Sequence, residues 1–258
     1  MAEEKTAPTV EELIEKITIA DIYRAAKQLE GTTRKTQLIE SDYFSELSGN
    51  HVYLKPENLQ HTGAFKLRGA FNRISQLSED EKKCGVITAS AGNHAQGVAF
   101  AAQKLGVKAV ICMPATTPIL KVEATRAYGA EVVLFGDGFD DAFAHSLELQ
   151  KQHGYIYVHP FNDLEVILGQ GTTALEIAEE LKDVDAILCP IGGGGFASGV
   201  ALAAKSINPQ VKVIGVEPEN AACMKAAIQK GKIATLSSAD TVADGCAVRT
   251  AGKLTLEF

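Results

Sequence analysis

Short apolar runs and helix-like stretches alternate along most of this 258-residue chain, and this alternation limits the possible folds more than any other feature. The expected strands lie at residues 85–88, 108–112, 131–135 and 155–158, and the expected helices between them lie at 95–105, 118–128 and 139–153. Strands separated by helices of this length are typical of βαβ units, whose strands run parallel. We therefore expect an α/β protein with mainly parallel sheets flanked by helices.

The same alternation resumes near residue 172 and indicates a second α/β layer. Its expected elements are a helix at 172–181, a strand at 185–190, a helix at 196–207, a strand at 212–217 and a helix at 221–230. Upstream, two helices at 10–17 and 19–29 and a strand at 51–54 are expected. We predict a larger discontinuous domain from residues 1–60 and 159–258 and a smaller domain from residues 61–158. Ligands of such folds bind at the carboxyl ends of strands, so the site is expected between the two domains.

The composition excludes several classes of protein. A net charge of −7 gives no basic surface for nucleic acid, and no apolar stretch is long enough to span a membrane. The first residues are acidic and lack the apolar core of a signal peptide, so we expect a cytoplasmic protein. The five cysteines are scattered without C-x-x-C spacing, which argues against a zinc site and a disulfide framework.

Lys66 stands near the start of an expected helix, within the segment KPENLQHTGAFKLRGAFNRI at residues 55–74. Thr62 is placed to cap this helix. The core-facing stripe of the helix consists of Leu67, Ala70, Phe71 and Ile74. The positive end of the helix dipole and partial burial should both lower the pKa of Lys66, which would free its amine for a Schiff base with an aldehyde or ketone. Taken alone, the same lysine can be a surface residue whose stem covers apolar neighbours.

The segment CPIGGGGFASG at residues 189–199 is predicted to be a strand, a run of glycines and a helix. Glycines allow a phosphate to approach backbone N–H groups, and a helix N-terminus attracts anions. The candidate phosphate ligands are Gly192, Gly193, Gly194 and Gly195. A tight structural turn is one alternative. The other is a dinucleotide site, because Gly192, Gly194 and Ala197 match that spacing and Glu217 could bind a ribose.

The segment ITASAGNHAQGV at residues 87–98 is a second predicted junction of strand and helix. Ser90 is placed to cap the helix, and the N–H groups from Ala91 through Gly92 and Asn93 to His94 would face an anion such as a carboxylate. The Asn93 amide can donate to or accept from a ligand. The His94 side chain alone favours packing in a loop over catalysis.

These three segments together predict one ligand. An activated amine, a phosphate cradle and a helix start that binds a carboxylate match a compound with an aldehyde and a phosphate that acts on a bound amino acid. Pyridoxal 5′-phosphate is that compound, whereas a nicotinamide cofactor would leave Lys66 and the loop from Ser90 to His94 without a role.

The motifs KPENLQHTGAFKLRGAF, SAGNHAQG and PIGGGG resemble those of the threonine/serine dehydratases, which are tryptophan-synthase-β-like (fold type II) pyridoxal-phosphate enzymes. The resemblance runs from about residue 19 to the end. It implies that Lys66 forms the Schiff base with the cofactor, that Phe65 flanks the cofactor ring and that Asn93 binds its 3′-oxygen. It also implies that Gly192, Gly193, Gly194 and Gly195 hold the phosphate. The segment of Ser90, Ala91, Gly92, Asn93 and His94 would hold the substrate carboxylate.

The implied reaction is a β-elimination in which Lys66 removes the α-proton of the amino acid. L-threonine would give 2-oxobutanoate and ammonia, as in isoleucine biosynthesis, and L-serine would give pyruvate. Serine racemases of the family carry a second serine directly after the position of Ser90, as a base on the opposite face. Ala91 stands there in this chain, which favours elimination over racemisation.

Two departures from the family pattern bear on other predictions. Relatives bind a divalent cation through a motif like the one at residues 216–221, but an expected aspartate is Cys223 here, so we predict no metal site. The family continues beyond a segment like AGKLT, so we expect an incomplete larger domain and a homo-oligomer. A racemase, another lyase or synthase of the fold, and a non-catalytic cofactor-binding fragment remain alternatives.

Overall fold

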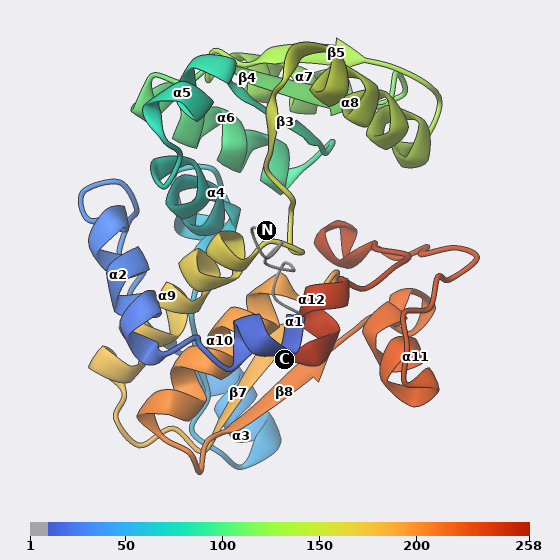
Figure 1. Cartoon of the computed structure of the whole chain (residues 1–258). Helices are drawn as coiled ribbons and strands as arrows, with labels where there is room; N and C mark the ends of the chain where they lie inside the picture. Colours follow the sequence, from blue (N-terminus) through green and yellow to red (C-terminus); the bar gives the residue numbers. More distant parts are fainter. Residues whose placement is uncertain (1–9) are drawn as a thin grey trace, which may run out of the picture.

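The computed structural model of the chain describes residues 10–258 and shows a layered α/β protein (Figure 1). The strands are β1 (Ile39–Glu40), β2 (Tyr53–Leu54), β3 (Val86–Ala89), β4 (Ala109–Met113), β5 (Glu131–Leu134), β6 (Ile156–Tyr157), β7 (Ala186–Pro190) and β8 (Lys212–Val216). The α-helices are α1 (Val10–Ile14), α2 (Ile19–Leu29), α3 (Asp42–Ser48), α4 (Lys66–Ser75), α5 (Glu79–Cys84), α6 (Asn93–Leu105), α7 (Ile119–Arg126), α8 (Phe139–His153), α9 (Leu164–Glu180), α10 (Gly195–Ile207), α11 (Cys223–Lys230) and α12 (Lys253–Glu257). Short 3₁₀ helices are η1 (Glu57–Leu59), η2 (Glu219–Ala221) and η3 (Asp244–Cys246).

A four-stranded sheet forms the upper part of the molecule in Figure 1, with the strand order β5-β4-β3-β6 and every neighbouring pair parallel. Successive residues of a strand point to opposite faces. Val86 and Ile111 therefore pack into the cluster with helices α4 and α6, while Ile87 and Val110 pack against Ala142 of α8. Helices cover both faces, so β3 and β4 are buried along their whole length, as expected for central parallel strands.

A second sheet in the lower part pairs β7 with β8 in parallel. One face packs against α10, α9 and α2 through a cluster that includes Cys189, Val200 and Ile22. The predicted α/β class with mainly parallel sheets is confirmed. The β1–β2 pair is the exception, since it is antiparallel.

Helix α9 runs between α4 and α10 and connects the upper and lower parts of the molecule. At both contacts, glycines allow the helix backbones to approach closely. A Cβ atom at Gly169 would lie 2.6 Å from the carbonyl oxygen of Arg68 in α4. A Cβ atom at Gly199 of α10 would lie 2.2 Å from the carbonyl oxygen of Ile167 in α9. The backbones of these helices therefore approach one another too closely for any side chain, which fixes how the two parts meet.

Several element boundaries differ from the prediction. The predicted helix 172–181 is the second half of α9, which begins eight residues earlier, at Leu164, after a cap in which Asp163 accepts a hydrogen bond from the Val166 N–H (3.2 Å). Gly169 and Gly171 lower helix propensity, but here close helix packing needs them. The predicted strand 51–54 is the short β2, and no prediction covered α3, α5 or α12. Along the described part of the chain, no helix is long and apolar enough to cross a membrane.

Candidate active site

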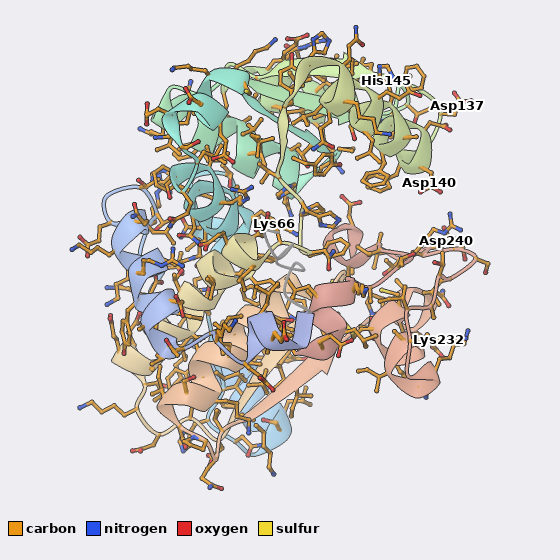
Figure 2. The ribbon with its side chains drawn as sticks, in the orientation of Figure 1. Lys66, Asp137, Asp140, His145, Lys232 and Asp240 are labelled. Carbon is orange, nitrogen blue, oxygen red and sulfur yellow. The ribbon has the colours of Figure 1, made fainter. Side chains whose placement is uncertain are left out.

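Lys66 is the first residue of α4 and lies between the upper and lower parts of the molecule (Figure 2). The N-cap position belongs to Phe65, which makes no side-chain capping bond. The prediction that Thr62 caps this helix is wrong, because Gly63 turns the chain with a left-handed φ of 71° before the helix begins. The Thr62 hydroxyl instead donates to the carbonyl oxygen of Ala64 (3.5 Å).

The amine of Lys66 is positioned by a backbone group. Its Nζ donates a hydrogen bond to the carbonyl oxygen of Pro160 at 2.8 Å. The side chain keeps a little solvent exposure, but protein atoms surround the amine and lower its pKa to about 8, because burial disfavours the ammonium form. The nearby Cys246 thiol acts weakly in the opposite direction. An amine with such a lowered pKa can act as a nucleophile.

Phe65 links Lys66 to the glycine segment. Its ring lies 4.2 Å from the ring of Phe196, centroid to centroid, and the Lys66 amine lies 5.5 Å from the Phe65 centroid. Phe196 is the second residue of α10, directly after the glycines. Residues more than a hundred positions apart thus meet at one place.

The glycines at residues 193–195 lie where side chains cannot be accommodated. A Cβ atom at Gly193 would lie 2.3 Å from the Phe161 ring, and one at Gly195 would lie 2.8 Å from the Phe161 Cα atom. Gly194 has a φ of 101°, which strongly favours glycine, and a Cβ atom there would lie 2.6 Å from the Thr255 hydroxyl. The run therefore requires glycine both for its conformation and for its close packing.

The polar groups of this run are divided between protein contacts and free donors. The Gly193 carbonyl oxygen accepts from the Thr255 hydroxyl (2.6 Å) and from the Gly252 N–H (3.1 Å). The N–H groups of residues 192–195 donate to no residue within the described part of the chain. They stand at the N-terminus of α10, where the helix dipole favours a negative charge. This arrangement can hold a phosphate.

The loop from Ser90 to His94 follows β3 and leads into α6. Gly92 occupies the N-cap position, and the Ser90 hydroxyl oxygen accepts a hydrogen bond from the Gly92 N–H (3.3 Å). The prediction that Ser90 caps α6 is therefore wrong, because its side chain closes a turn within the loop. The N–H groups of Ala91, Asn93 and His94 donate to nothing among the described residues, so they remain available for an anion.

Two imidazoles near Lys66 are neutral. His94 is buried and its Nε2 lies 2.9 Å from the carbonyl oxygen of Val158, to which it donates. Burial, and secondarily the charge of Lys66, lowers its pKa to about 3. The same two causes lower the pKa of His159 to about 4. Around neutral pH, these histidines therefore add no positive charge beside Lys66.

Two further segments contribute to the site and were not predicted from the sequence. Residues 158–163 bring the Pro160 carbonyl to Lys66 and the Phe161 ring to the glycines. Residues 244–248 pass close to Gly192, whose added Cβ would lie 3.5 Å from the Cα atom of Cys246. The first segment follows the strand at 155–158, so its place at the carboxyl end of a strand was a usable signal. The sequence around Cys246 carries no such signal.

The Glu217 carboxylate binds backbone groups of this protein. Its carboxylate oxygens accept hydrogen bonds from the N–H groups of Met224 and Lys225, at 2.9 Å each, at the start of α11. This occupation argues against Glu217 as a ribose ligand. Cys223 is buried with its Sγ 3.4 Å from the Gly192 carbonyl oxygen. Over the described residues, no group of three or more His, Cys, Asp and Glu side chains is arranged to hold a metal ion.

Comparison with known proteins identifies relatives over most of the chain. The family described as pyridoxal-phosphate dependent enzyme matches residues 29–258. An L-threonine ammonia-lyase from Thermotoga maritima is 51% identical over 242 residues, which make up 94% of this chain and 60% of that protein. The chain thus spans about three fifths of the length of this relative.

Solved structures share the fold. The processed form of threonine deaminase isoform 2 from Solanum lycopersicum is 45% identical, with a TM-score of 0.89, over 97% of this chain and 68% of that chain. A serine racemase from Dictyostelium discoideum is 39% identical, with a TM-score of 0.86, over 93% of this chain and 77% of that one.

Proposed function

The chain belongs to the pyridoxal-phosphate dependent enzymes, and from this premise we propose that it eliminates water from L-threonine to leave an enamine, which water then hydrolyses to 2-oxobutanoate and ammonia. We propose the same conversion of L-serine to pyruvate. The observation that carries the proposal is Lys66, an enclosed amine with a pKa of about 8 that lies next to a run of glycines with free N–H groups. The similarity to an L-threonine ammonia-lyase supports the choice of substrate.

The residues of the site fit pyridoxal phosphate. Lys66 offers the amine for the aldehyde, and Gly192, Gly193, Gly194 and Gly195 offer donors for the phosphate without Cβ atoms in the way. We assign Phe65 to the face of the ring and Asn93 to its hydroxyl oxygen. When bound, the cofactor supplies an electron sink that stabilises negative charge on the α-carbon of the substrate.

Lys66 has two roles in this proposal. Its amine would hold the cofactor until the substrate amine takes that place. The released Lys66 amine would then accept the α-proton of the substrate as a general base. A pKa of about 8 brings this base close to physiological pH, where a normal lysine with a pKa of 10.5 would be almost fully protonated.

The loop from Ser90 to His94 would orient the substrate. The N–H groups of Ala91, Asn93 and His94 are free to donate to its carboxylate, and the Ser90 side chain holds the loop by its bond with the Gly92 N–H. Ala91 offers no hydroxyl that could move a proton on the opposite face of the α-carbon. This absence favours elimination over racemisation.

The proposal is tested by turnover of L-threonine beside a covalent label. Borohydride reduction of the cofactor-loaded chain should fix the cofactor on Lys66, and the chain should release 2-oxobutanoate from L-threonine. Lys66→Ala should lose both properties. Lys104→Ala is the matched control, because the Lys104 amine also lies over a phenylalanine ring (5.6 Å from the Phe100 centroid) but belongs to the last turn of α6, at the opposite end of that helix from the loop.

Each alternative outcome has a distinct meaning. A label on another lysine would contradict the site assignment. Formation of D-serine from L-serine without 2-oxo acid would identify a racemase. Full cofactor binding with no turnover of either amino acid would identify a non-catalytic cofactor-binding protein.

We also propose a homo-oligomer in the cytoplasm. Exposed apolar side chains such as Leu47, Leu120 and Leu188 support self-association, and the five free cysteines are in keeping with a reducing compartment. Light scattering on the purified chain would contradict the oligomer if the mass stayed that of a monomer at every concentration.

A further inference from the structure

Tyr157 ends β6 and reaches the last residue of β3. Its phenol oxygen accepts a hydrogen bond from the Ala89 N–H at 3.2 Å. The ring packs among Ile87, Ala142 and Phe143, with the Phe143 ring edge-on at 6.1 Å. The hydroxyl therefore sits directly behind the point where β3 passes into the loop from Ser90 to His94.

This hydroxyl replaces a bond that the sheet would normally supply. In the parallel register Ile87 pairs with Tyr157, and the Val158 N–H donates to the Ile87 carbonyl oxygen (2.9 Å). Regular pairing would next join the Ala89 N–H to the Val158 carbonyl oxygen. That oxygen instead accepts the bond from His94 Nε2 at 2.9 Å. The Ala89 N–H would have no partner without Tyr157.

The direction of every bond behind Ala89 follows from the groups involved. The Ser146 hydroxyl lies 2.6 Å from the Phe143 carbonyl oxygen, which can only accept, so Ser146 donates there. The Tyr157 hydroxyl must then donate to the Ser146 oxygen, 3.3 Å away. A one-way chain of hydrogen bonds thus runs from Ala89 through Tyr157 and Ser146 to Phe143 in α8.

Two side-chain bonds therefore hold the two ends of the loop against the end of β6. Tyr157 holds Ala89 just before the loop, and the Val158 carbonyl holds His94, its last residue. Two residues after Val158, the Pro160 carbonyl oxygen accepts the hydrogen bond from the Lys66 amine. Hydrogen bonds to residues 157–160 therefore position both the loop and the Lys66 amine.

We propose that Tyr157 is a positioning residue, whose hydroxyl fixes the loop from Ser90 to His94 so that its free N–H groups meet the substrate carboxylate. This inference rests on the proposed function, because it assigns the loop to substrate binding. It concerns binding of the amino acid and leaves the proton transfer by Lys66 untouched.

The test is Tyr157→Phe in the full chain, which keeps the ring and its packing but removes the hydroxyl. The KM for L-threonine should rise about tenfold while kcat changes by less than about twofold, because an unpaired N–H frees the loop and weakens binding of the ground state and transition state alike. Exchange of the Ala89 amide hydrogen with deuterium should become faster in the chain without substrate. The absorbance of the bound cofactor should not change.

Two variants serve as comparisons. Tyr155→Phe removes a hydroxyl two residues away whose partner is the surface amine of Lys108 (3.0 Å), and it should alter neither KM nor exchange at Ala89. Ser146→Ala removes the acceptor for the Tyr157 hydrogen but leaves the bond to Ala89, so it should raise KM by a smaller factor.

Unchanged exchange at Ala89 in Tyr157→Phe would overturn the proposal, as would a fall in kcat at constant KM. If the unaltered chain fails to convert L-threonine, the proposed function is wrong. The exchange measurement still decides in that case whether the hydroxyl holds the loop, because it needs neither substrate nor turnover.

Discussion

The four-stranded sheet and the β7–β8 pair consist of similarly apolar strands, but helices cover them differently. In the first, β3 and β4 are buried on both faces. In the second, the side chains on the face away from α10 are open, with Leu188 67% and Ile214 45% exposed. Parallel strands with apolar residues on both sides are normally covered on both sides. The two halves of the site therefore differ in how well their sheets are covered. The loop from Ser90 to His94 follows a strand that is buried on both faces, whereas the glycines follow a strand with one open face.

The largest expected effect is on the free energy of unfolding, when one apolar side chain in each sheet is truncated to alanine. Ile87→Ala should lower the free energy of unfolding by about 3 kcal/mol, because Ile87 is fully buried and the cavity is not refilled. Leu188→Ala should change it by less than about 0.5 kcal/mol, since the side chain is mostly in water. Urea unfolding measures both. Equal losses would show that the open face of β7–β8 is covered in solution.

A second comparison tests the glycine half of the site. Gly193→Ala should weaken cofactor binding at least tenfold and cost about 2 kcal/mol of stability, because the added methyl group collides with the Phe161 ring. Gly138→Ala is the control, because its Cβ would meet nothing within 4 Å and its φ is −131°. Cofactor titration and thermal unfolding report the two effects. Normal binding by Gly193→Ala would refute the phosphate cradle.

The pH dependence of stability tests Lys66 in the chain without cofactor. The folded-state pKa of about 8 lies below the ordinary 10.5, so the unfolded chain binds more protons between these values. The free energy of unfolding should therefore rise with pH across this window, by at most about 1.4 kcal/mol per pH unit. Lys66→Met should remove this rise. An unchanged slope in Lys66→Met would show that the amine titrates normally.

The smallest expected effect concerns two exposed ion pairs that join the halves. Lys121 of α7 pairs with Asp244 (2.7 Å), and Asp140 of α8, labelled in Figure 2, pairs with Arg249 (3.1 Å). Exposed pairs contribute little and salt screens them. Lys121→Asp should change cofactor affinity by less than about twofold, and Lys121→Asp with Asp244→Lys should restore it. A large loss that the double variant fails to restore would indicate that Lys121 acts in another way.

The sequence predicted those parts of the site that depend on local pattern. Lys66 at a helix start and the glycines after a strand follow from residue type and spacing, and the structure brings them together through Phe65 and Phe196. Both helix caps were predicted wrongly. Ser90 and Thr62 are favourable capping residues, but Gly63 turns the chain before α4, and the Ser90 side chain closes a turn within its own loop. Phe65 and Gly92 therefore hold the two cap positions.

Contributions from distant segments had no local pattern to predict them. Thr255 binds the Gly193 carbonyl across 62 positions, and Cys246 reaches Lys66 only because the chain folds back. Likewise, Gly169 and Gly171 lower helix propensity within α9, and only the close approach of α4 and α10 explains why a helix persists there. Tertiary packing overrode the local preference in these cases.

Residues 158–163 form one short segment that contacts all three parts of the site. The carbonyl of Val158 fixes His94, the carbonyl of Pro160 fixes Lys66, and the ring of Phe161 fills the space beside Gly193. A single inserted or deleted residue here would misalign Lys66, the loop from Ser90 to His94 and the run of glycines in one step, whereas the same change in a surface turn would disturb none of them. The tolerance of this site to length variation is therefore set by six residues that contain neither the lysine nor the glycines.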